Sequence, residues 1–338
     1  MKILAINNYD LEWVFKEKGK VPAQHSWGVD YLRRKGLQVD THIWKIPSIY
    51  YRLFKNKSYR AYKLTFFLYL LVRWYKYESI ITFFSDELCL SVLIRMKKMG
   101  VIKAKLYTIV HHSGIPKDLL ETMDGCIFLS SEIYKKSYKN FKLKNVSFLW
   151  WGADAPFYER TYNVMNLMKK RFANPIIVSN GDTNRDHSLL VDACLQSGVN
   201  CLIFDSNIKS NARIKTTPRA GYIDMLKRIR KCAIMAVPVI NLNQNTIQCI
   251  RGFNSIIDGM ILGMPIIISD NCNLPFNIDE LGIGLTYKGE DVQSLKEKIL
   301  FMTQHPEVME EMGRRAREFA LKNDYLKYCT DLYQILTS

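Results

Sequence analysis

Short apolar runs alternate with amphipathic stretches along the chain, and this pattern predicts parallel strands separated by helices. In the first half the predicted strands are Lys2–Asn8, Val39–Trp44, Ser79–Phe84, Lys105–Val110, Cys126–Leu129 and Val146–Leu149. The helices predicted between them are Trp27–Lys35, Glu87–Met99, Lys117–Thr122 and Ser130–Asn140. A strand, a helix and a second strand at this spacing form a parallel unit.

The second half repeats the pattern from its own start. Its predicted strands are Pro175–Val178, Asn200–Phe204, Ala233–Val237 and Ile266–Ile268, and its predicted helices are Ser188–Gln196, Tyr222–Cys232, Val292–Thr303, Pro306–Leu321 and Asp324–Leu336. A chain of 338 residues is long for one core. We therefore expect an α/β protein with two facing, doubly wound, Rossmann-like domains, residues 1–155 and 156–322, and an interdomain cleft. The last helix, within 323–338, is expected to pack back on the first domain.

The stretch from Ile250 to Asn271 carries the clearest chemical signal of the second half. A glycine-containing loop, Arg251–Asn254, runs into a short apolar helix that Gly263 and Pro265 end, and a branched strand follows. The amides at a helix N-terminus favour an anion, most often a phosphate. Asp258, one turn into the helix, could hydrogen-bond a ribose hydroxyl.

A structural alternative exists for the same residues. Ser255 and Asp258 have the spacing of a helix capping box, in which both side chains satisfy backbone amides and bind no ligand.

The cysteines indicate neither a disulfide framework nor a metal site. All eight are scattered, none forms a C-x-x-C pair, and most lie in apolar runs typical of a reduced core. The N-terminal run is too short for a signal-peptide core. A D-x-D pair is also absent, and Asp182 and Asp186 share their loop with Arg185. We therefore predict no metal ion.

The positive charge is concentrated in the first half. Residues 1–150 hold 26 Lys and Arg against 12 Asp and Glu, a net charge of +14, whereas the remainder carries +2. Residues 44–77 contain no acid and many aromatic residues, and their longest uncharged core, Leu64–Val72, is too short to cross a bilayer. This composition favours an in-plane interfacial segment on an anionic membrane. An ordinary helix with a solvated basic face is the alternative; RNA binding could use the same residues, but no RNA-binding module accompanies them.

Five motifs in order resemble those of GT-B-fold glycosyltransferases, especially the family 4 type that builds bacterial polysaccharides, lipopolysaccharide and glycolipids. They are VHH at 110–112, FLSSEIYKKSY with LWWGADAPFYE, NGDTNRDHSLLVDA, FNSIIDGMILGMPIIISDN, and the pair IGLTYKGEDVQSLKEKI and HPEVMEEMGRRAREFA. The resemblance implies a nucleotide diphosphate sugar, of UDP or GDP type, bound by the second domain and an acceptor bound by the first. It implies no cofactor beyond this donor substrate.

The resemblance also assigns roles to individual residues. His111 takes the place of the family histidine near the transferred sugar, and Arg185 that of a basic residue on the diphosphate. The other donor-binding candidates are Gly181, Arg251, Gly252, Asn254, Ser255 and Asp258, which replaces a glutamate that contacts the ribose. The acceptor candidates are Trp27, Gly28 and His112, which follows the strand that ends at Val110.

Two positions depart from the family pattern. Asp182 follows Gly181 where a second basic residue is usual, and Ile250 replaces the upstream glutamate of the two-glutamate motif. Either Arg251 supplies the missing positive charge, or recognition of the sugar is degraded.

These observations predict a peripheral enzyme on the cytoplasmic face of the plasma membrane that transfers a sugar to a lipid-linked or polysaccharide acceptor. The resemblance suggests retention of the anomeric configuration, with the donor phosphate deprotonating the acceptor. A nucleotide-sugar epimerase on the same fold and a catalytically silent sugar-binding protein are the alternatives; no nucleic-acid partner is expected.

Overall fold

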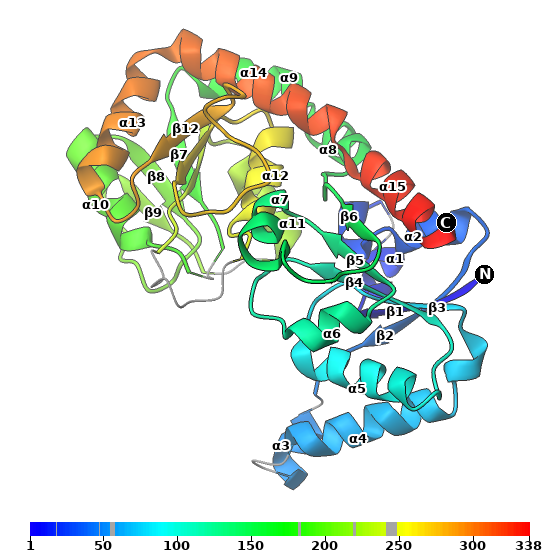
Figure 1. Ribbon diagram of the computed structural model, residues 1–338. Helices are drawn as coiled ribbons and strands as arrows, with labels where there is room; N and C mark the ends of the chain where they lie inside the picture. Colours follow the sequence, from blue (N-terminus) through cyan, green and yellow to red (C-terminus); the bar gives the residue numbers. More distant parts are fainter. Residues whose placement is uncertain (18, 47, 55–57, 182–183, 219–220, 241–248) are drawn as a thin grey trace. The chain divides into compact units, whose positions relative to one another are not determined.

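The computed structural model describes residues 1–17, 19–46, 48–54, 58–181, 184–218, 221–240 and 249–338 (Figure 1). The chain divides into two compact units. Unit 1 comprises Met1–Trp150 and Tyr328–Ser338, and unit 2 comprises Trp151–Lys327. The predicted domain boundaries, at residues 155 and 322, each differ by five residues from these unit boundaries, at 150 and 327.

Unit 1 contains a six-stranded sheet in the order β2-β1-β3-β4-β5-β6, and all of its strand pairs are parallel. Its strands are β1 (Lys2–Asn7), β2 (Gln38–Ile43), β3 (Ser79–Thr82), β4 (Lys105–Val110), β5 (Gly125–Phe128) and β6 (Val146–Phe148). The central strands are buried along nearly their whole length. This burial is typical of a parallel sheet covered on both faces, and it explains why these strands read as continuous apolar runs.

Short helices connect the strands of unit 1. They are α1 (Glu12–Lys16), η1 (Ala23–Ser26), α2 (Val29–Arg34), α3 (Ser48–Phe54), α4 (Ser58–Leu71), η3 (Trp74–Lys76), α5 (Glu87–Lys98), α6 (Lys117–Thr122), α7 (Ser131–Ile133) and η4 (Tyr134–Tyr138).

Two helix predictions in unit 1 were wrong in detail. The helix predicted from Trp27 begins two residues later, because Trp27 and Gly28 both have left-handed backbone angles, with φ of 53° and 85°. The helix predicted over Ser130–Asn140 is one α-helical turn followed by a π-helical turn.

Unit 2 contains a second parallel sheet, in the order β12-β11-β10-β7-β8-β9. Its strands are β7 (Ile176–Ser179), β8 (Asn200–Ile203), β9 (Ile214–Thr216), β10 (Ile234–Val237), β11 (Ile266–Ser269) and β12 (Gly284–Tyr287). The predicted α/β class with two Rossmann-like sheets is confirmed. The sequence prediction missed the two edge strands, β9 and β12, which are short and only partly buried.

The helices of unit 2 are α8 (Ala155–Tyr162), α9 (Val164–Arg171), α10 (His187–Ser197), α11 (Tyr222–Ile229), α12 (Phe253–Ile261), α13 (Val292–Gln304) and α14 (Pro306–Lys322). The last helix, α15 (Tyr325–Thr337), starts in unit 2 and continues into unit 1. An aspartate begins several of the helices, and its carboxylate accepts a hydrogen bond from the amide three residues on. These N-cap residues are Asp86, Asp154, Asp186 and Asp291.

Candidate functional site

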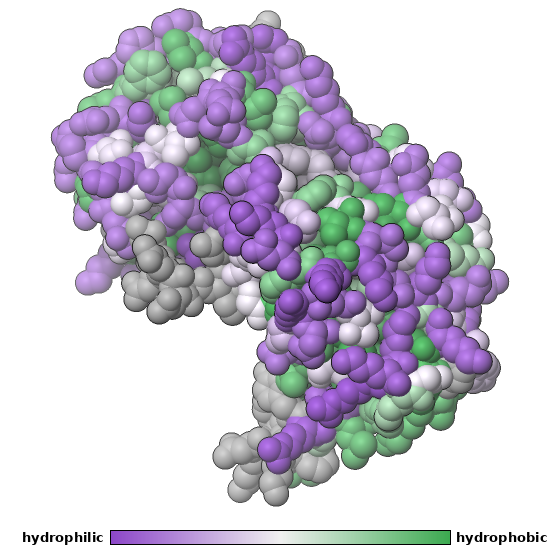
Figure 2. All heavy atoms as spheres, viewed as in Figure 1, coloured by the Kyte–Doolittle hydropathy of each residue, from purple (hydrophilic) through white to green (hydrophobic). Residues whose placement is uncertain are grey.

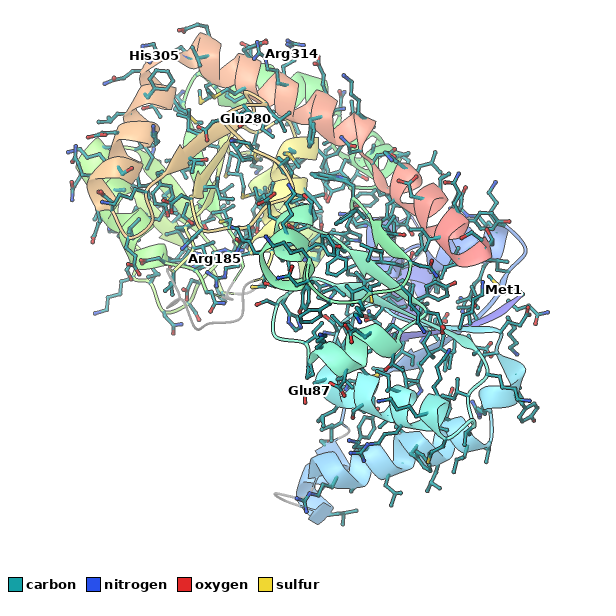
Figure 3. All side chains as sticks on the ribbon, in the orientation of Figure 1. Met1, Glu87, Arg185, Glu280, His305 and Arg314 are labelled. Atoms are coloured by element: carbon teal, nitrogen blue, oxygen red, sulfur yellow. The ribbon has the colours of Figure 1, made fainter. Side chains whose placement is uncertain are left out.

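The loop after strand β7 brings Arg185 against two glycines of unit 2. Backbone hydrogen bonds pair this loop with residues 238–240, and Arg185 itself forms an antiparallel bridge with Val239. Its Nη2 atom lies 3.1 Å from the position that a Cβ atom would take on Gly181 and 3.2 Å from the same position on Gly252. The guanidinium therefore packs against both glycines. Arg185 is labelled in Figure 3. Asp182 lies outside the described residues.

Gly252 is the N-cap residue of α12, and its position requires glycine for two reasons. Its φ is +74°, in the left-handed region, and an added Cβ atom would lie 2.3 Å from Cγ1 of Val237. Gly252 also has no side chain that could cap the first turn. Helix geometry leaves the first-turn amides without intrahelical partners, so this end of α12 carries partial positive charge beside Arg185.

Ser255 and Asn254 face different surroundings at the start of α12. The Ser255 hydroxyl is buried and donates a hydrogen bond of 3.1 Å to the carbonyl oxygen of Asn180, which ties the helix to the end of strand β7. Asn254 is exposed. The capping-box alternative is wrong, because Gly252 occupies the N-cap position and the Ser255 side chain bonds outside the helix.

Arg251 adds a second cation next to this helix end, and this one is buried. Its side chain is 7% exposed, and its Nη1 donates to the carbonyl oxygen of Ile240 at 3.2 Å. Its buried Nε has no hydrogen-bond partner among the described residues. Burial raises the pKa of the Cys272 thiol to about 11, and the positive charges of Arg185 and Arg251 both oppose that rise. The positive charges of Arg185 and Arg251 therefore both reach the surroundings of Cys272.

Asp258, the predicted ribose ligand, is buried and hydrogen-bonded to two tyrosines. The residue is only 1% exposed, and its Oδ1 accepts hydrogen bonds from the hydroxyls of Tyr158 at 2.6 Å and Tyr222 at 2.7 Å. The two hydroxyl oxygens lie 3.0 Å apart. Burial raises the pKa of the Asp258 carboxyl to about 7, although the two tyrosine hydrogen bonds lower it. Both tyrosines bond to Oδ1, whereas the buried Oδ2 has no hydrogen-bond partner among the described residues. The role of Asp258 as a ribose ligand therefore stays a prediction.

The sequence reasoning missed both tyrosines of this cluster. Tyr158 lies in α8, in the stretch interpreted as a domain boundary, and Tyr222 begins α11. These positions are 100 and 36 residues from Asp258. No local pattern could have joined them, because the parallel fold alone brings them together.

Two buried arginines hold the other end of α12. Arg171 donates through Nη2 to the carbonyl oxygens of Leu262 and Gly263, and Arg317 donates to the carbonyl oxygen of Ile261. Cations at a helix C-terminus satisfy carbonyls that the helix leaves unpaired and interact favourably with its dipole. Helix α12 is thus fixed at its C-terminus, which steadies the position of its N-terminus.

In unit 1, Trp27 and Gly28 occupy a tight turn before α2. The Trp27 indole donates through Nε1 to the Tyr9 hydroxyl at 2.7 Å, and its ring packs on Phe83 and His111 with centroid separations of 5.8 and 6.2 Å. A Cβ atom on Gly28 would lie 3.0 Å from Cδ2 of Leu332 in α15. Gly28 therefore serves close packing as well as the turn.

The two histidines that follow β4 have different environments. Burial, helped by the neighbouring His112, lowers the pKa of His111 to about 4, so this imidazole is neutral near pH 7. The structure gives its ring nitrogens no hydrogen bond from the described residues. His112 has Nδ1 2.6 Å from the Ser113 carbonyl oxygen and Nε2 3.2 Å from the Ser85 carbonyl oxygen. It therefore braces two loops, whereas His111 is the more available of the two predicted site histidines.

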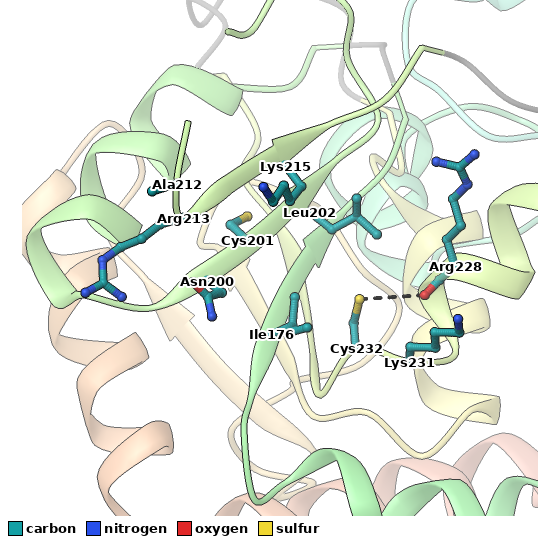
Figure 4. A pocket seen from close by; sticks show the side chains of 10 residues that line it. All are labelled: Ile176, Asn200, Cys201, Leu202, Ala212, Arg213, Lys215, Arg228, Lys231 and Cys232. Carbon is teal, nitrogen blue, oxygen red and sulfur yellow. Dashed lines mark hydrogen bonds between the residues drawn. The ribbon is translucent and has the colours of Figure 1, made fainter. Parts of the chain in front are cut away.

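A cavity of about 390 Å³ in unit 2 lies away from the predicted donor residues (Figure 4). Ile176 and Asn200 line it, and they are the first residues of strands β7 and β8. Gly181 and Arg185, in contrast, follow the carboxyl end of β7. In open parallel sheets ligands bind at the carboxyl ends of the strands, so this cavity is not the candidate site.

Metal ligands do not gather in the part of the chain that the structure describes: no three His, Cys, Asp or Glu side chains there could share an ion. The chemistry available in unit 2 is instead anion binding, by Arg185, Arg251 and the N-terminus of α12. Unit 1 offers a neutral imidazole beside an aromatic ring.

Solved structures with the same fold were found by structural comparison. Sucrose-phosphate synthase from Thermosynechococcus elongatus is similar to this chain, with a TM-score of 0.72 and 15% sequence identity over 99% of this chain and 98% of that chain. A glycosyltransferase from Rickettsia africae matches with a TM-score of 0.68 and 13% identity over 100% and 98% of the two chains. HepE from Anabaena, solved with UDP-glucose, gives a TM-score of 0.65 and 13% identity over 100% and 99%.

At these identities the likeness shows the fold alone, and that fold is GT-B. No family model matches the sequence, and no curated protein does. Membership of family 4 therefore stays a prediction.

Proposed function

We propose that this protein is a glycosyltransferase that moves a sugar from a nucleotide diphosphate sugar to a lipid-linked or saccharide acceptor. The observation that carries the proposal is the packing of Arg185 over Gly181 and Gly252 at the N-terminus of α12. That arrangement gives unit 2 a cationic site at the carboxyl edge of its sheet. Three fold neighbours are structures of one protein with UDP or UDP-glucose, and they favour a UDP sugar as donor.

The diphosphate of the donor would lie against the first turn of α12. Arg185 would contact it directly, and the buried charge of Arg251 would add to the local field. These groups act where negative charge develops as the nucleotide leaves, which is the most effective place for electrostatic catalysis. Ser255 and Asn180 hold the helix end in place, so little reorganisation is needed when the charge appears.

The acceptor would bind to unit 1 beside Trp27 and His111. The indole offers an apolar face to a sugar ring, and its Nε1 is already held by Tyr9. His111 is neutral, so it can accept or donate one hydrogen bond without bringing a charge next to an oxocarbenium-like centre.

We propose a retaining reaction without a metal ion. The acceptor hydroxyl oxygen bonds to the anomeric carbon, the bond from that carbon to the diphosphate oxygen breaks, and a donor phosphate oxygen takes the hydroxyl proton. The two arginines and the helix end stabilise the departing diphosphate.

We further propose that the enzyme works at the cytoplasmic face of the plasma membrane. The net charge of +14 over residues 1–150 would attract anionic lipid head groups. Within the described residues, no helix has both the length and the hydropathy needed to cross a membrane. The enzyme would therefore use a peripheral surface of unit 1.

A thermal-shift panel of UDP and GDP sugars tests the proposal. A specific donor raises the melting temperature, and the rise grows with the logarithm of its concentration relative to its Kd. We expect one UDP sugar to stabilise the wild type and to stabilise Arg185→Gln much less. Hydrolysis of that donor without acceptor would then distinguish an enzyme from a silent binding protein. If no nucleotide sugar shifts the melting temperature, the proposal fails.

A further inference from the structure

An open groove of about 530 Å³ lies between helices α4 and α5 of unit 1. Its lining combines an apolar floor with four cations, Arg60, Lys63, Arg95 and Lys98. The groove belongs to neither the predicted donor residues nor the predicted acceptor residues. Two of its cations, Arg95 and Lys98, come from α5, outside the basic segment at residues 44–77.

Both helices turn one face toward the groove. On α4 the lining residues follow helical spacing from Arg60 through Lys63 and Leu64 to Phe67, and on α5 from Val92 through Arg95 to Met99. Residues three and four apart share a side of a helix. The groove is therefore formed by two complementary helix faces and does not depend on a single loop.

A second face of α4 is apolar and exposed to solvent. Leu64 and Leu68 of α4 and Val72, the first residue after it, are spaced four apart and are 60%, 52% and 65% exposed. The opposite face buries Tyr62, Phe66 and Leu70. Figure 2 shows hydrophobic side chains gathered over α4 at the lower edge of the view. Since Leu64 belongs both to this exposed stripe and to the groove, the two surfaces are continuous.

The groove lining carries only positive charge. None of its lining residues is acidic, and the nearest acid acting on Lys63 is Glu87, at the first turn of α5. Lys63 donates to the Ser91 hydroxyl at 2.9 Å, which links the two helices. Burial and the nearby charge of Arg95 both lower the pKa of Lys63. Like charges held together in this way favour an anion between them.

We propose that the groove between α4 and α5 binds one anionic phospholipid, with its phosphate among the four cations and the start of an acyl chain on Phe67 and Val92. The proposal rests on the membrane location in the proposed function and names the lipid class that the surface recognises. A free phosphate would gain nothing from the apolar floor or from the exposed stripe beside it. A zwitterionic phosphatidylcholine has the same phosphate, but its quaternary ammonium would bring a further positive charge against the four cations.

Binding of monomeric dihexanoylphosphatidylglycerol, below its micellar concentration, tests the site by titration calorimetry. The double variant Arg95→Gln/Lys98→Gln removes two groove cations. The control variant Lys139→Gln/Lys144→Gln removes the same charge from exposed residues elsewhere in unit 1. We expect the groove variant to bind at least about 10-fold more weakly, and the control to change less than about 3-fold. Dihexanoylphosphatidylcholine should bind poorly to all three proteins.

Three results would overturn the proposal. Equal weakening in both double variants would mean that only net charge matters. Glycerol phosphate binding as tightly as the lipid would mean a simple phosphate site. Absence of lipid binding by the wild type would remove the site altogether.

Met99→Glu, at a residue that is 57% exposed, provides a second variant whose new carboxylate should also repel the lipid.

Nucleotide binding separates this inference from the proposed function. The groove variant should bind the donor as the wild type does, because its substitutions lie outside unit 2. Loss of lipid binding with intact donor binding therefore supports the groove. Lack of donor binding in the wild type would count against the proposed enzyme while leaving the lipid measurement interpretable.

Discussion

Replacing Gly252 by alanine tests whether the start of α12 has to be glycine. Two costs can be worked out from the structure. A left-handed backbone costs an L-residue about 1 kcal/mol relative to glycine, and φ at this position is +74°. The new methyl would also lie 2.3 Å from Cγ1 of Val237. Relief of such an overlap in a packed core typically costs about 1–3 kcal/mol. The expected loss in the free energy of unfolding is therefore about 2–4 kcal/mol.

Gly198 provides a matched control, because it ends α10 with a φ of +72° and has no atom within 4 Å of an added Cβ. Gly198→Ala should lower the free energy of unfolding only by the cost of the left-handed backbone, about 1 kcal/mol. Urea denaturation of both variants gives the two losses directly. Since Arg185 lies 3.2 Å from the same Cβ position on Gly252, the Gly252 variant should also weaken nucleotide diphosphate binding. Equal stability losses, or intact nucleotide binding in Gly252→Ala, would refute this reasoning.

Three further predictions concern the residues around the two candidate sites. The pKa of Asp258 rises from 3.8 to about 7 on folding, so the folded state binds more protons than the unfolded state between these two pH values. The free energy of unfolding should therefore fall as the pH rises from about 4 to 7, by at most about 4 kcal/mol. Asp258→Asn should remove this pH dependence, and the free energies of unfolding of both proteins at about pH 5 and pH 7.5 would measure the difference. The same change with pH in variant and wild type would contradict the prediction. Arg171→Met should lower the free energy of unfolding by about 2–4 kcal/mol, because buried carbonyls at the end of α12 lose their donor. Arg213→Met, at an exposed arginine that caps α10, should lower it by less than about 0.5 kcal/mol. Similar losses for both variants in urea denaturation would argue that Arg171 does not hold the end of α12. Because the pKa of His111 is lowered to about 4, its ring proton resonances in NMR spectra should stay constant from about pH 5.5 to 8. A titration near pH 6.5 would contradict this lowered pKa.

The parallel strands and the glycine-containing loop before α12 could be predicted because their signals are local. The run Ile266–Ile268 has the branched composition and the length of a buried strand. The loop before α12 is indicated by Gly252 and by the apolar helix that follows it. The edge strands β9 and β12 gave no such signal, because each is short and half exposed.

The environment of Asp258 could not be predicted for a different reason. Its carboxylate is held by Tyr158 and Tyr222, which come from separate helices far along the chain. A sequence pattern places an acid on a helix but does not reveal which side chains from other elements will cover it. The same limit applies to Arg171 and Arg317, whose charged groups reach the far end of α12 only after folding.

The proposed function requires that Arg185 and the N-terminus of α12 bind a diphosphate. Titration calorimetry of UDP, and of uridine as its counterpart without phosphates, tests it in the wild type and in Arg185→Met. We expect UDP affinity to fall by at least about 10-fold in the variant, which is about 1.4 kcal/mol, while uridine affinity stays the same. Unchanged UDP affinity in Arg185→Met, or equal loss of uridine and UDP binding, would contradict the account.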